Sequence, residues 1–382
     1  MKLGNIFEKK NELNRNQFTE NRTISIATMT FKPSGNGADE NSIPKYKVLR
    51  LGDIAFEGHK NKDFAFGRFL MNDIGDGIIS PRFTFLHAKE KLDIDFWKYY
   101  IHHESIMRTI LVKSTKQGTM MNELVVTDFL KQGIKVPEKS EQKIIGIFLT
   151  RLDHTITLQQ RKLELFKKLK QGYLQQMFPS KDQYIPRLRF KEFNGDWEQR
   201  KLDDVVEFYS GLTYSPDNVQ EDGTFVLRSS NVKNGEIIDA DNVYVSHEVV
   251  NSGNVQEGDV IVVVRNGSRD LIGKHAQIKR QMDNTVIGAF MTGVRSETPD
   301  FTNAMLDTQQ FAVEINKNLG ATINQITTGA FKKMQFVVPK DRDEREAIGT
   351  FFRSIDDTIT LQQNEIEQLQ QLKQAYLQKL FP

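Results

Sequence analysis

The chain contains one helical segment twice, and this internal repeat limits its possible folds more than any other feature. Residues 145–179 read IGIFLTRLDHTITLQQRKLELFKKLKQGYLQQMFP, and residues 348–382 read IGTFFRSIDDTITLQQNEIEQLQQLKQAYLQKLFP. The two segments align without a gap at an offset of 203 residues and share the run TITLQQ. A repeat of this kind indicates one structural unit built twice. We therefore expect two copies of the same frame.

Each copy is predicted to form one long helix, over residues 141–179 and 341–382. A Val-Pro pair precedes each helix, and a Phe-Pro pair ends it because proline cannot continue a helix. Glu141 and Glu344 lie near the first turns, where acidic groups suit the helix dipole. A helix of roughly 37 residues is ~55 Å long at ~1.5 Å per residue, which favours a coiled coil.

The apolar residues of each helix follow the 3.5-residue period of a left-handed supercoil. The predicted interface comprises Ile145, Leu149, Leu152, Ile156, Gln159, Leu163 and Phe166, and their counterparts Ile348, Phe352, Ile355, Ile359, Gln362, Ile366 and Leu369. With a slight change of phase, the pattern continues through Leu169, Tyr173 and Met177, and through Leu372, Tyr376 and Leu380. Gln159 and Gln362 occupy the same place. A buried amide there fixes the register, whereas an exposed one points to solvent, and the sequence leaves both interpretations open.

The charges of the two helices favour pairing with each other. Residues 141–179 contain 7 basic and 3 acidic residues, whereas residues 344–382 contain 4 basic and 6 acidic ones. Opposite net charges favour a mixed pair over self-pairing. An internal two-fold relation between the repeats predicts an antiparallel pair. The alternative, that each helix binds an external partner, remains open.

A region of roughly 140 residues precedes each helix, which is an ordinary domain size. We expect a first domain over residues 1–140, and a connector and second domain over residues 180–340. Leu51-Gly-Asp-Ile54 in the first domain parallels Glu257-Gly-Asp-Val260 in the second. Between such landmarks the two domains diverge, as expected if they perform one kind of task on different targets.

An α+β fold is predicted for each domain. Strands are expected at Phe225–Leu227, Val260–Val264 and Phe336–Val338, and helices at Phe96–Ile101 and Met305–Ile315. The apolar residues of the connector segment 185–197 indicate that it packs against a domain.

The composition excludes several classes of protein. The chain has no cysteine, so disulfides and thiolate metal sites cannot hold the fold. No signal-peptide pattern and no run of 18 apolar residues is present, so we expect a soluble, cytoplasmic protein without membrane contact. The net charge of +2 neither supports nor excludes DNA binding.

Motifs for enzymatic chemistry are absent. The segment from Gly267 to Lys274 misses the spacing of a phosphate-binding loop by one residue. The sequence contains no dinucleotide-binding fingerprint, no metal-ligand spacing of histidines and no Asn-Pro or Asp-Pro pair of an adenine methyltransferase. We therefore expect neither a catalytic residue nor a metal site.

The whole frame resembles the specificity (S) subunit of type I restriction-modification enzymes. The resemblance is carried by IPRLRFKEFNGDW at residues 185–197, by the two Gly-Asp turns, by EQKII from Glu141, and by the Leu-Lys-Gln-x-Tyr-Leu-Gln helix ends. The first copy departs from this pattern, because it begins at Met1 and lacks the segment that precedes Lys201. The resemblance therefore does not predict how the start of the first domain packs.

The resemblance implies both architecture and function. It implies two α/β target recognition domains in a pseudo-two-fold tandem repeat, separated by an antiparallel two-helix coiled coil. Each domain would read one half of a split site on double-stranded DNA, and the helices would set the spacing. Two modification subunits that bind S-adenosylmethionine would dock on the chain, and restriction subunits that use ATP and Mg would complete an endonuclease. The chain itself would bind no cofactor.

Polar, cationic loops are the candidate DNA contacts. In the second domain these are Arg265, Asn266, Ser268, Arg269 and Lys274; in the first they are Lys60, Lys62, Arg68, Lys116 and Thr119. Arginine suits guanine edges, asparagine adenine edges, and lysine or serine phosphates. Ordinary surface turns are the alternative for these loops. For the whole chain, the alternatives are a self-contained restriction or methylation enzyme and a coiled-coil adaptor that binds no DNA.

Overall fold

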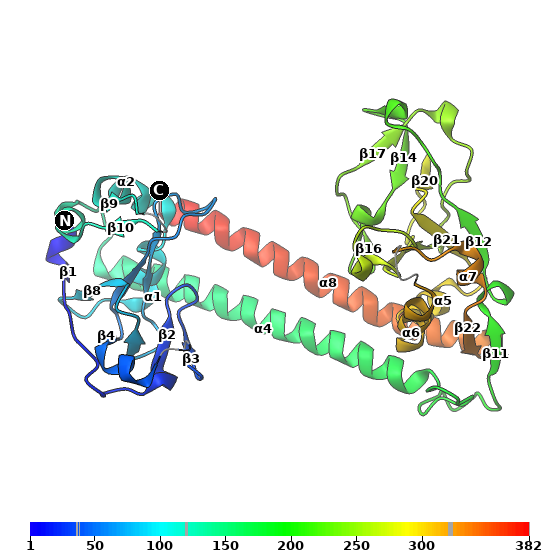
Figure 1. Ribbon diagram of the computed structural model, residues 1–382, viewed down its shortest axis with the longest axis horizontal. Coiled ribbons are helices and arrows are strands. Elements are labelled where there is room, and N and C mark those ends of the chain that lie inside the picture. The colour runs from blue at the N-terminus through cyan, green and yellow to red at the C-terminus, as the bar shows by residue number, and fades with distance from the viewer. Residues whose placement is uncertain (36, 38, 119–120, 320–323, 382) are drawn as a thin grey trace. The chain divides into compact units, whose positions relative to one another are not determined.

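The computed structural model describes residues 1–35, 37, 39–118, 121–319 and 324–381 (Figure 1). The chain forms two compact units, Met1–Gln160 with Asn364–Pro382, and Arg161–Gln363. Each unit therefore combines one globular domain with parts of both long helices. The predicted α+β class is confirmed, since each unit contains sheets and helices. Among the residues described, no helix is long and apolar enough to cross a membrane.

The main sheet has the same topology in both units. In unit 1 its antiparallel order is β1-β8-β5-β6, with bounds Phe7–Glu8, Thr84–Ala88, Ile54–Glu57 and Arg68–Met71. In unit 2 the antiparallel order is β12-β21-β18-β19, with bounds Glu207–Ser210, Met291–Arg295, Val260–Val263 and His275–Gln277. The four strands thus occur in the same order along the chain and across the sheet, which demonstrates the repeat in the domains.

The second sheet differs at its edge. Unit 1 has the order β3-β2-β7-β4, with bounds Thr30–Lys32, Thr23–Ser25, Gly77–Ile79 and Lys47–Leu49. Unit 2 has β13-β17-β14-β20, with bounds Val219–Gln220, Val243–Val245, Thr224–Leu227 and Thr285–Ile287. Both sheets share a parallel pair, β2 with β7 and β14 with β20. The fourth strand joins opposite edges, so the domains share a frame and differ at its periphery.

Short strand pairs and helices complete each unit. Unit 1 contains β9 and β10 (Thr115–Lys116, Glu123–Leu124) and the helices α1, α2 and α3 (Ile94–Tyr100, Glu104–Ser114, Val126–Lys131). Unit 2 contains the pairs β11–β22 (Glu198–Lys201, Gln335–Val338) and β15–β16 (Val232–Lys233, Glu236–Ile237), and the helices α5, α6 and α7 (Pro299–Leu306, Gln309–Asn318, Thr328–Lys332). The single helix predicted at Met305–Ile315 is wrong. It is broken because the Thr308 side chain accepts a hydrogen bond from the Phe311 amide and caps α6.

The long helices are α4 (Lys139–Met177) and α8 (Arg342–Leu380), each of 39 residues. The predicted antiparallel pairing is confirmed within each unit. In unit 1 the Phe148 and Tyr376 rings lie 4.8 Å apart, beside the ion pair of Asp153 and Lys373. In unit 2 Tyr173 and Phe351 lie 4.9 Å apart. The contacts are equivalent because subtracting 203 from the α8 residues gives their α4 counterparts. Each long helix therefore supplies the phenylalanine and aspartate in one unit and the tyrosine and lysine in the other.

All fourteen residues of the predicted helix interface are buried or half-buried. Ile145 and Leu149 belong to the core of unit 1, together with Phe381 at the end of α8. Gln159 donates a hydrogen bond to Glu365 at 2.6 Å, and Gln362 is buried. Of the two interpretations left open for these amides, the buried one fits Gln362.

The continuation of the apolar stripe differs most from the prediction at one leucine in each helix. Leu169 and Leu372 are exposed, at 46% and 45%. The next residues, Lys170 and Lys373, instead bind an aspartate of the other helix. An ion pair therefore replaces the expected apolar contact, because the lysine ammonium reaches a carboxylate that leucine cannot bind.

A glycine in each long helix permits close contact with the domain. A Cβ atom on Gly146 would lie 2.7 Å from the Phe96 amide nitrogen, and one on Gly349 would lie 2.5 Å from that of Phe301. These distances are far below ordinary van der Waals contact. The equivalence of Gly146 and Gly349 also identifies α1 and α5 as corresponding helices.

Candidate nucleic-acid interface

Buried aspartates fix the turns that precede the loops predicted to bind DNA. Asp53 accepts a hydrogen bond from the Arg50 amide at 2.9 Å, and Asp259 accepts one from the Gln256 amide at 2.8 Å. Each aspartate also binds a cationic or titratable side chain on the adjacent strand, His87 in β8 and Arg295 in β21. The two Gly-Asp landmarks in the sequence are therefore structural: they position β5 and β18.

In unit 2 the predicted loop follows β18 and is fastened to the segment before α7. Arg265 forms a bridge with Gln325, and the Asn324 side chain donates to the Gly267 carbonyl at 2.9 Å. Arg265, Ser268, Arg269 and Lys274 are exposed. The loop is thus held at its base and presents cationic and polar groups to solvent.

Asn266 shapes this loop from within. Its amide group donates to the Ser229 hydroxyl at 2.9 Å and accepts from the Ser268 amide at 3.0 Å. Both ends of the side chain are therefore engaged, which reduces its capacity for an adenine edge.

Phe290 is a surface residue that sequence reasoning missed. Its ring is 51% exposed, and the Arg265 guanidinium carbon lies 4.9 Å from the ring centroid. The Phe290 carbonyl also accepts hydrogen bonds from the Val264 and Arg265 amides. An aromatic face beneath the guanidinium limits its motion and leaves its donors available to a ligand. The short turn around Phe290 gives no signal of this contact in the sequence.

Unit 1 repeats the arrangement with other residues. The segment after β5 contains exposed Lys60 and Lys62, and its Gly58 carbonyl accepts from the Asn122 amide at 2.8 Å. Asn122 directly precedes β10, which pairs with the strand that contains exposed Lys116. The structure therefore brings together two loops that the sequence indicated separately. Thr119 lies outside the described residues.

Arg68 differs from the other predicted contacts because its guanidinium already has partners. It donates to Glu57 at 2.6 Å and to the Ala27 carbonyl at 3.0 Å. Its charge is neutralised by the carboxylate, so it is less suited to a phosphate than Lys60 or Lys62.

An ionic cluster fastens the domain of unit 2 to the helices. The Lys170 ammonium lies between Asp356 of α8 and Asp307 at the end of α5, and Asp307 also binds His275 of β19. Burial alone would lower the pKa of His275, but the hydrogen bond and charge of Asp307 raise it. Burial raises the pKa of Asp307, but the hydrogen bonds and charges of His275 and Lys170 lower it by more. The pKa of Asp307 therefore lies well below its usual range. The histidine and the carboxylate therefore each favour the charged form of the other.

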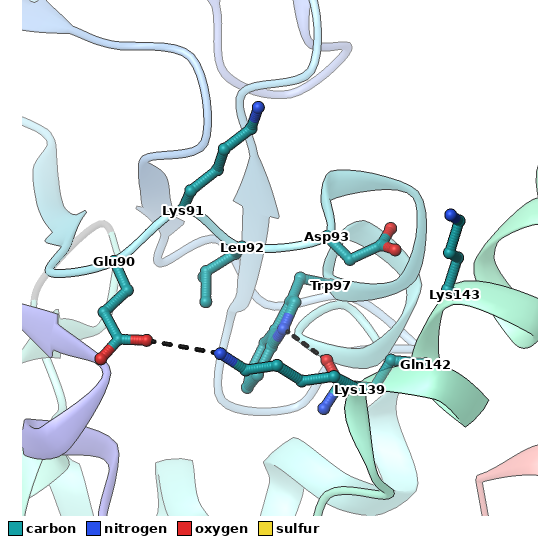
Figure 2. Close-up of a pocket in the computed structure, with 8 residues that line it drawn as sticks. All are labelled: Glu90, Lys91, Leu92, Asp93, Trp97, Lys139, Gln142 and Lys143. Atoms are coloured by element: carbon teal, nitrogen blue, oxygen red, sulfur yellow. Dashed lines mark hydrogen bonds and ion pairs between the residues drawn. The ribbon is translucent and has the colours of Figure 1, made fainter.

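A tryptophan packs at the start of each long helix, but the two come from different segments. In unit 2 Trp197 of the connector donates to Glu344, and Arg189 binds the same carboxylate. In unit 1 Trp97 of α1 donates to Gln142 at 3.2 Å, beside a recess of about 280 Å³ in which Lys139 pairs with Glu90 (Figure 2). Near the start of unit 1, the Phe7 ring packs edge-on against Trp97, with 5.8 Å between the ring centroids.

Among the residues described, no group of three or more His, Cys, Asp or Glu side chains is placed to hold a metal ion. In each unit, exposed cations lie on loops that are fixed by buried contacts.

Comparison with known proteins identifies this frame. The family model for the type I restriction modification DNA specificity domain matches residues 1–168 and 194–371, which is most of both units. The chain belongs to this family.

Two proteins named as type I specificity subunits are similar to most of this chain. The type I restriction enzyme MjaVIII specificity subunit of Methanocaldococcus jannaschii is 24% identical over 318 residues, covering 80% of this chain and 73% of that protein. The putative MjaX specificity subunit of the same organism is 22% identical over 383 residues, covering 95% and 85%. The crystal structure of the S subunit from M. genitalium superposes with a TM-score of 0.64 at 15% identity, covering 100% of this chain and 95% of that one. The last similarity supports the fold.

Proposed function

We propose that this chain is the DNA sequence-specificity subunit of a type I restriction-modification complex. In this proposal each recognition domain reads one half of a bipartite site, and the chain contributes recognition rather than catalysis. The observation that supports it most is the match of the specificity-domain family to both repeats. The shared main sheet with different peripheral strands fits two readers that recognise different half-sites.

The fastened loops are the proposed contacts with double-stranded DNA. Arg265 above Phe290 suits the major-groove edge of a guanine, because a stacked guanidinium presents two parallel donors. Lys60, Lys62 and Lys116 suit phosphates, since a flexible ammonium pairs with any backbone position. Such contacts position the domain, while the arginine and its neighbours discriminate between bases.

The long helices are proposed to set the spacing of the half-sites and to bind two modification subunits. Each unit has exposed apolar residues on these helices. In unit 1 they include Ile144, Phe148 and Leu372, at 70%, 39% and 45%, and in unit 2 Leu165 and Leu361, at 66% and 69%. Exposed apolar side chains on both helices are compatible with a protein partner. In the complex, the modification subunits would bind S-adenosylmethionine, and restriction subunits would use ATP and Mg.

Sequencing the methylated bases of a host that carries the chain with its modification subunits tests the proposal. The expected pattern is a split motif with two defined halves and an unspecified gap. Replacing residues 201–340 by another recognition domain should change one half of the motif alone. A change in both halves would contradict modular reading.

Two further outcomes separate this proposal from its alternatives. Methyl transfer by the purified chain without partners would indicate a self-contained enzyme. Partners that co-purify while no DNA sequence is bound would indicate an adaptor protein.

A further inference from the structure

We propose that a recess in the domain of unit 1 reads a base with an exocyclic amino group through the Glu57 carboxylate. This inference rests on the proposed function and names the chemistry of one position in the first half-site. The recess has a volume of about 480 Å³. It is lined by residues 23–27 and by Lys32, Glu57, His59, Ser80, Arg82 and Phe83.

Glu57 supplies an acceptor that is fixed in place. Its Oε2 atom accepts a hydrogen bond from Arg68 Nε at 2.6 Å, and Arg68 is held in turn by the Ala27 carbonyl. The Oε1 atom lies 3.9 Å from His59 Nδ1, which is too far for a hydrogen bond. One oxygen is therefore anchored, and the other retains its lone pairs for a ligand. An ionised carboxylate only accepts, so this ligand must be a donor.

Thr23 supplies a second, independent indication of a ligand. Thr23 is 2% exposed, and its hydroxyl has no hydrogen-bond partner among the described residues. Buried polar groups are nearly always satisfied, because an unpaired one costs about 1–3 kcal/mol. Thr23 lines the same recess as Glu57, and a hydroxyl both donates and accepts, so it can join the hydrogen bonds of a ligand there.

The cations of the recess are exposed, whereas its acceptors are buried. The cations Lys32 and Arg82 are exposed, while Glu57 and Thr23 are buried. Lys60 and Lys62 follow directly in the chain and are also exposed. Outer cations with an inner acceptor suit a nucleotide, which has anionic phosphates and a neutral base. They do not suit a free cation.

For a contact in the major groove, the chemistry of the bases narrows the ligand to cytosine or adenine. In the major groove these two bases present an amino donor, at N4 and N6, whereas guanine and thymine present O6 and O4 acceptors. A carboxylate repels those acceptors. Cytosine and adenine share the chemistry that Glu57 requires, and the test below distinguishes them.

The experiment uses the full chain assembled with its modification subunits and the DNA site found by methylation sequencing. Each adenine or cytosine of the first half-site is replaced in turn by purine or pyrimidin-2-one, which lack only the amino group. Binding should weaken at one position by roughly 10- to 100-fold, the range for a hydrogen bond to a charged group. The analogue that causes the loss identifies the base.

Two variants then test whether Glu57 is the acceptor. Arg68→Met keeps the Glu57 carboxylate. In this variant, removal of the amino group from the identified base should therefore still weaken binding (the amino-deletion penalty). Glu57→Met combined with Arg68→Met removes the acceptor without leaving an unpaired arginine, and the penalty should vanish. Penalties in the second half-site should be unchanged in both variants, which also shows that they remain folded. Exposed Glu8→Gln serves as a matched control.

Three outcomes overturn the inference in different ways. A penalty that persists in the double variant assigns the amino group to another residue. A wild-type complex that tolerates amino deletion throughout the first half-site shows that no amino group is read there. Failure of the wild-type complex to recognise any bipartite site refutes the proposed function itself, and the inference with it.

Discussion

The Lys170 ammonium lies 2.6 Å from the Asp356 carboxylate, and the Lys373 ammonium lies 2.6 Å from that of Asp153. The second pair is equivalent to the first with α4 and α8 exchanged. Lys373 lies 203 positions after Lys170, and Asp356 lies 203 positions after Asp153. Each domain adds a different third partner: Asp307 binds Lys170, and the Tyr99 hydroxyl donates to Asp153. The helices therefore repeat their pairing, while each domain attaches to it in its own way.

Removing the Lys170 ammonium should destabilise unit 2 strongly. Lys170→Met leaves Asp307 and Asp356 without their shared cation, and breaking a buried ion pair costs about 3–5 kcal/mol. Urea unfolding followed by Trp197 fluorescence, in a Trp97→Phe background, measures this unit because the chain has only two tryptophans. Exposed Lys168→Met should change the unfolding free energy by less than about 0.5 kcal/mol. Equal effects of the two substitutions would refute the role of the cluster.

The same glycine-to-alanine substitution should have opposite effects at different places in α4. A Cβ atom on Gly172 would meet no neighbouring group within 4 Å, so Gly172→Ala should stabilise the helix by about 0.5–1 kcal/mol. Gly146→Ala should destabilise unit 1, because its Cβ would meet the α1 backbone at 2.7 Å. Thermal unfolding of the two variants provides the comparison. Stabilisation by both would show that α1 moves aside freely.

The stability of unit 2 should fall as the pH rises above 6.5. The pKa of His275 is raised above its ordinary value of 6.5, so its charged form stabilises the fold below that pH. The contribution is lost as the pH rises through the higher folded pKa, with a slope of up to about 1.4 kcal/mol per pH unit. Urea unfolding between about pH 6 and pH 9 should show this slope in the wild type. His275→Gln should remove it, whereas exposed His154→Gln should not; a slope retained in His275→Gln would exclude this histidine.

Substitutions in the loops proposed to bind DNA should separate discrimination between bases from general affinity for DNA. Arg265→Ala should relax the preference at one position of the second half-site by about 1–3 kcal/mol. Lys62→Ala should weaken binding to all sequences alike and reduce the salt dependence by about one ion. Phe290→Ala should resemble a weaker form of Arg265→Ala, because the arginine loses its support. Binding assays at several salt concentrations distinguish these effects, and a uniform loss in Arg265→Ala would contradict base reading.

The repeated parts of the fold could be predicted from the sequence, because periodicity and internal alignment depend on residues close together in the chain. The long helices, their antiparallel pairing and the buried position of Ile156 or Ile366 follow from such patterns. The inward position of Lys170 could not be predicted, since it depends on a carboxylate supplied by the other helix. The same holds for Trp97, which donates to Gln142 as Trp197 does to Glu344.

The candidate site was predictable only in part. Loops with cations and glycine indicated Arg265 and Lys60, and the structure fastens each loop to a segment some 60 residues further along the chain. The recess around Thr23 and Glu57 draws on four separate stretches of sequence, none of which has a distinctive motif. Sites that form only through tertiary contacts leave no local signal.

Because α4 and α8 each contain the aspartate, the lysine, the phenylalanine and the tyrosine of the paired contacts, two copies of either helix could form the same four contacts, although the net charges favour the mixed pair. A half-length ancestor with one domain and one helix would thus have closed the same contacts as a homodimer, with Phe178 of one copy in the place of Phe381. If its domain read DNA as proposed for this chain, such a dimer would read a palindrome. On the proposed function, a single chain with two different domains is free of that constraint, so the two halves of its target can differ.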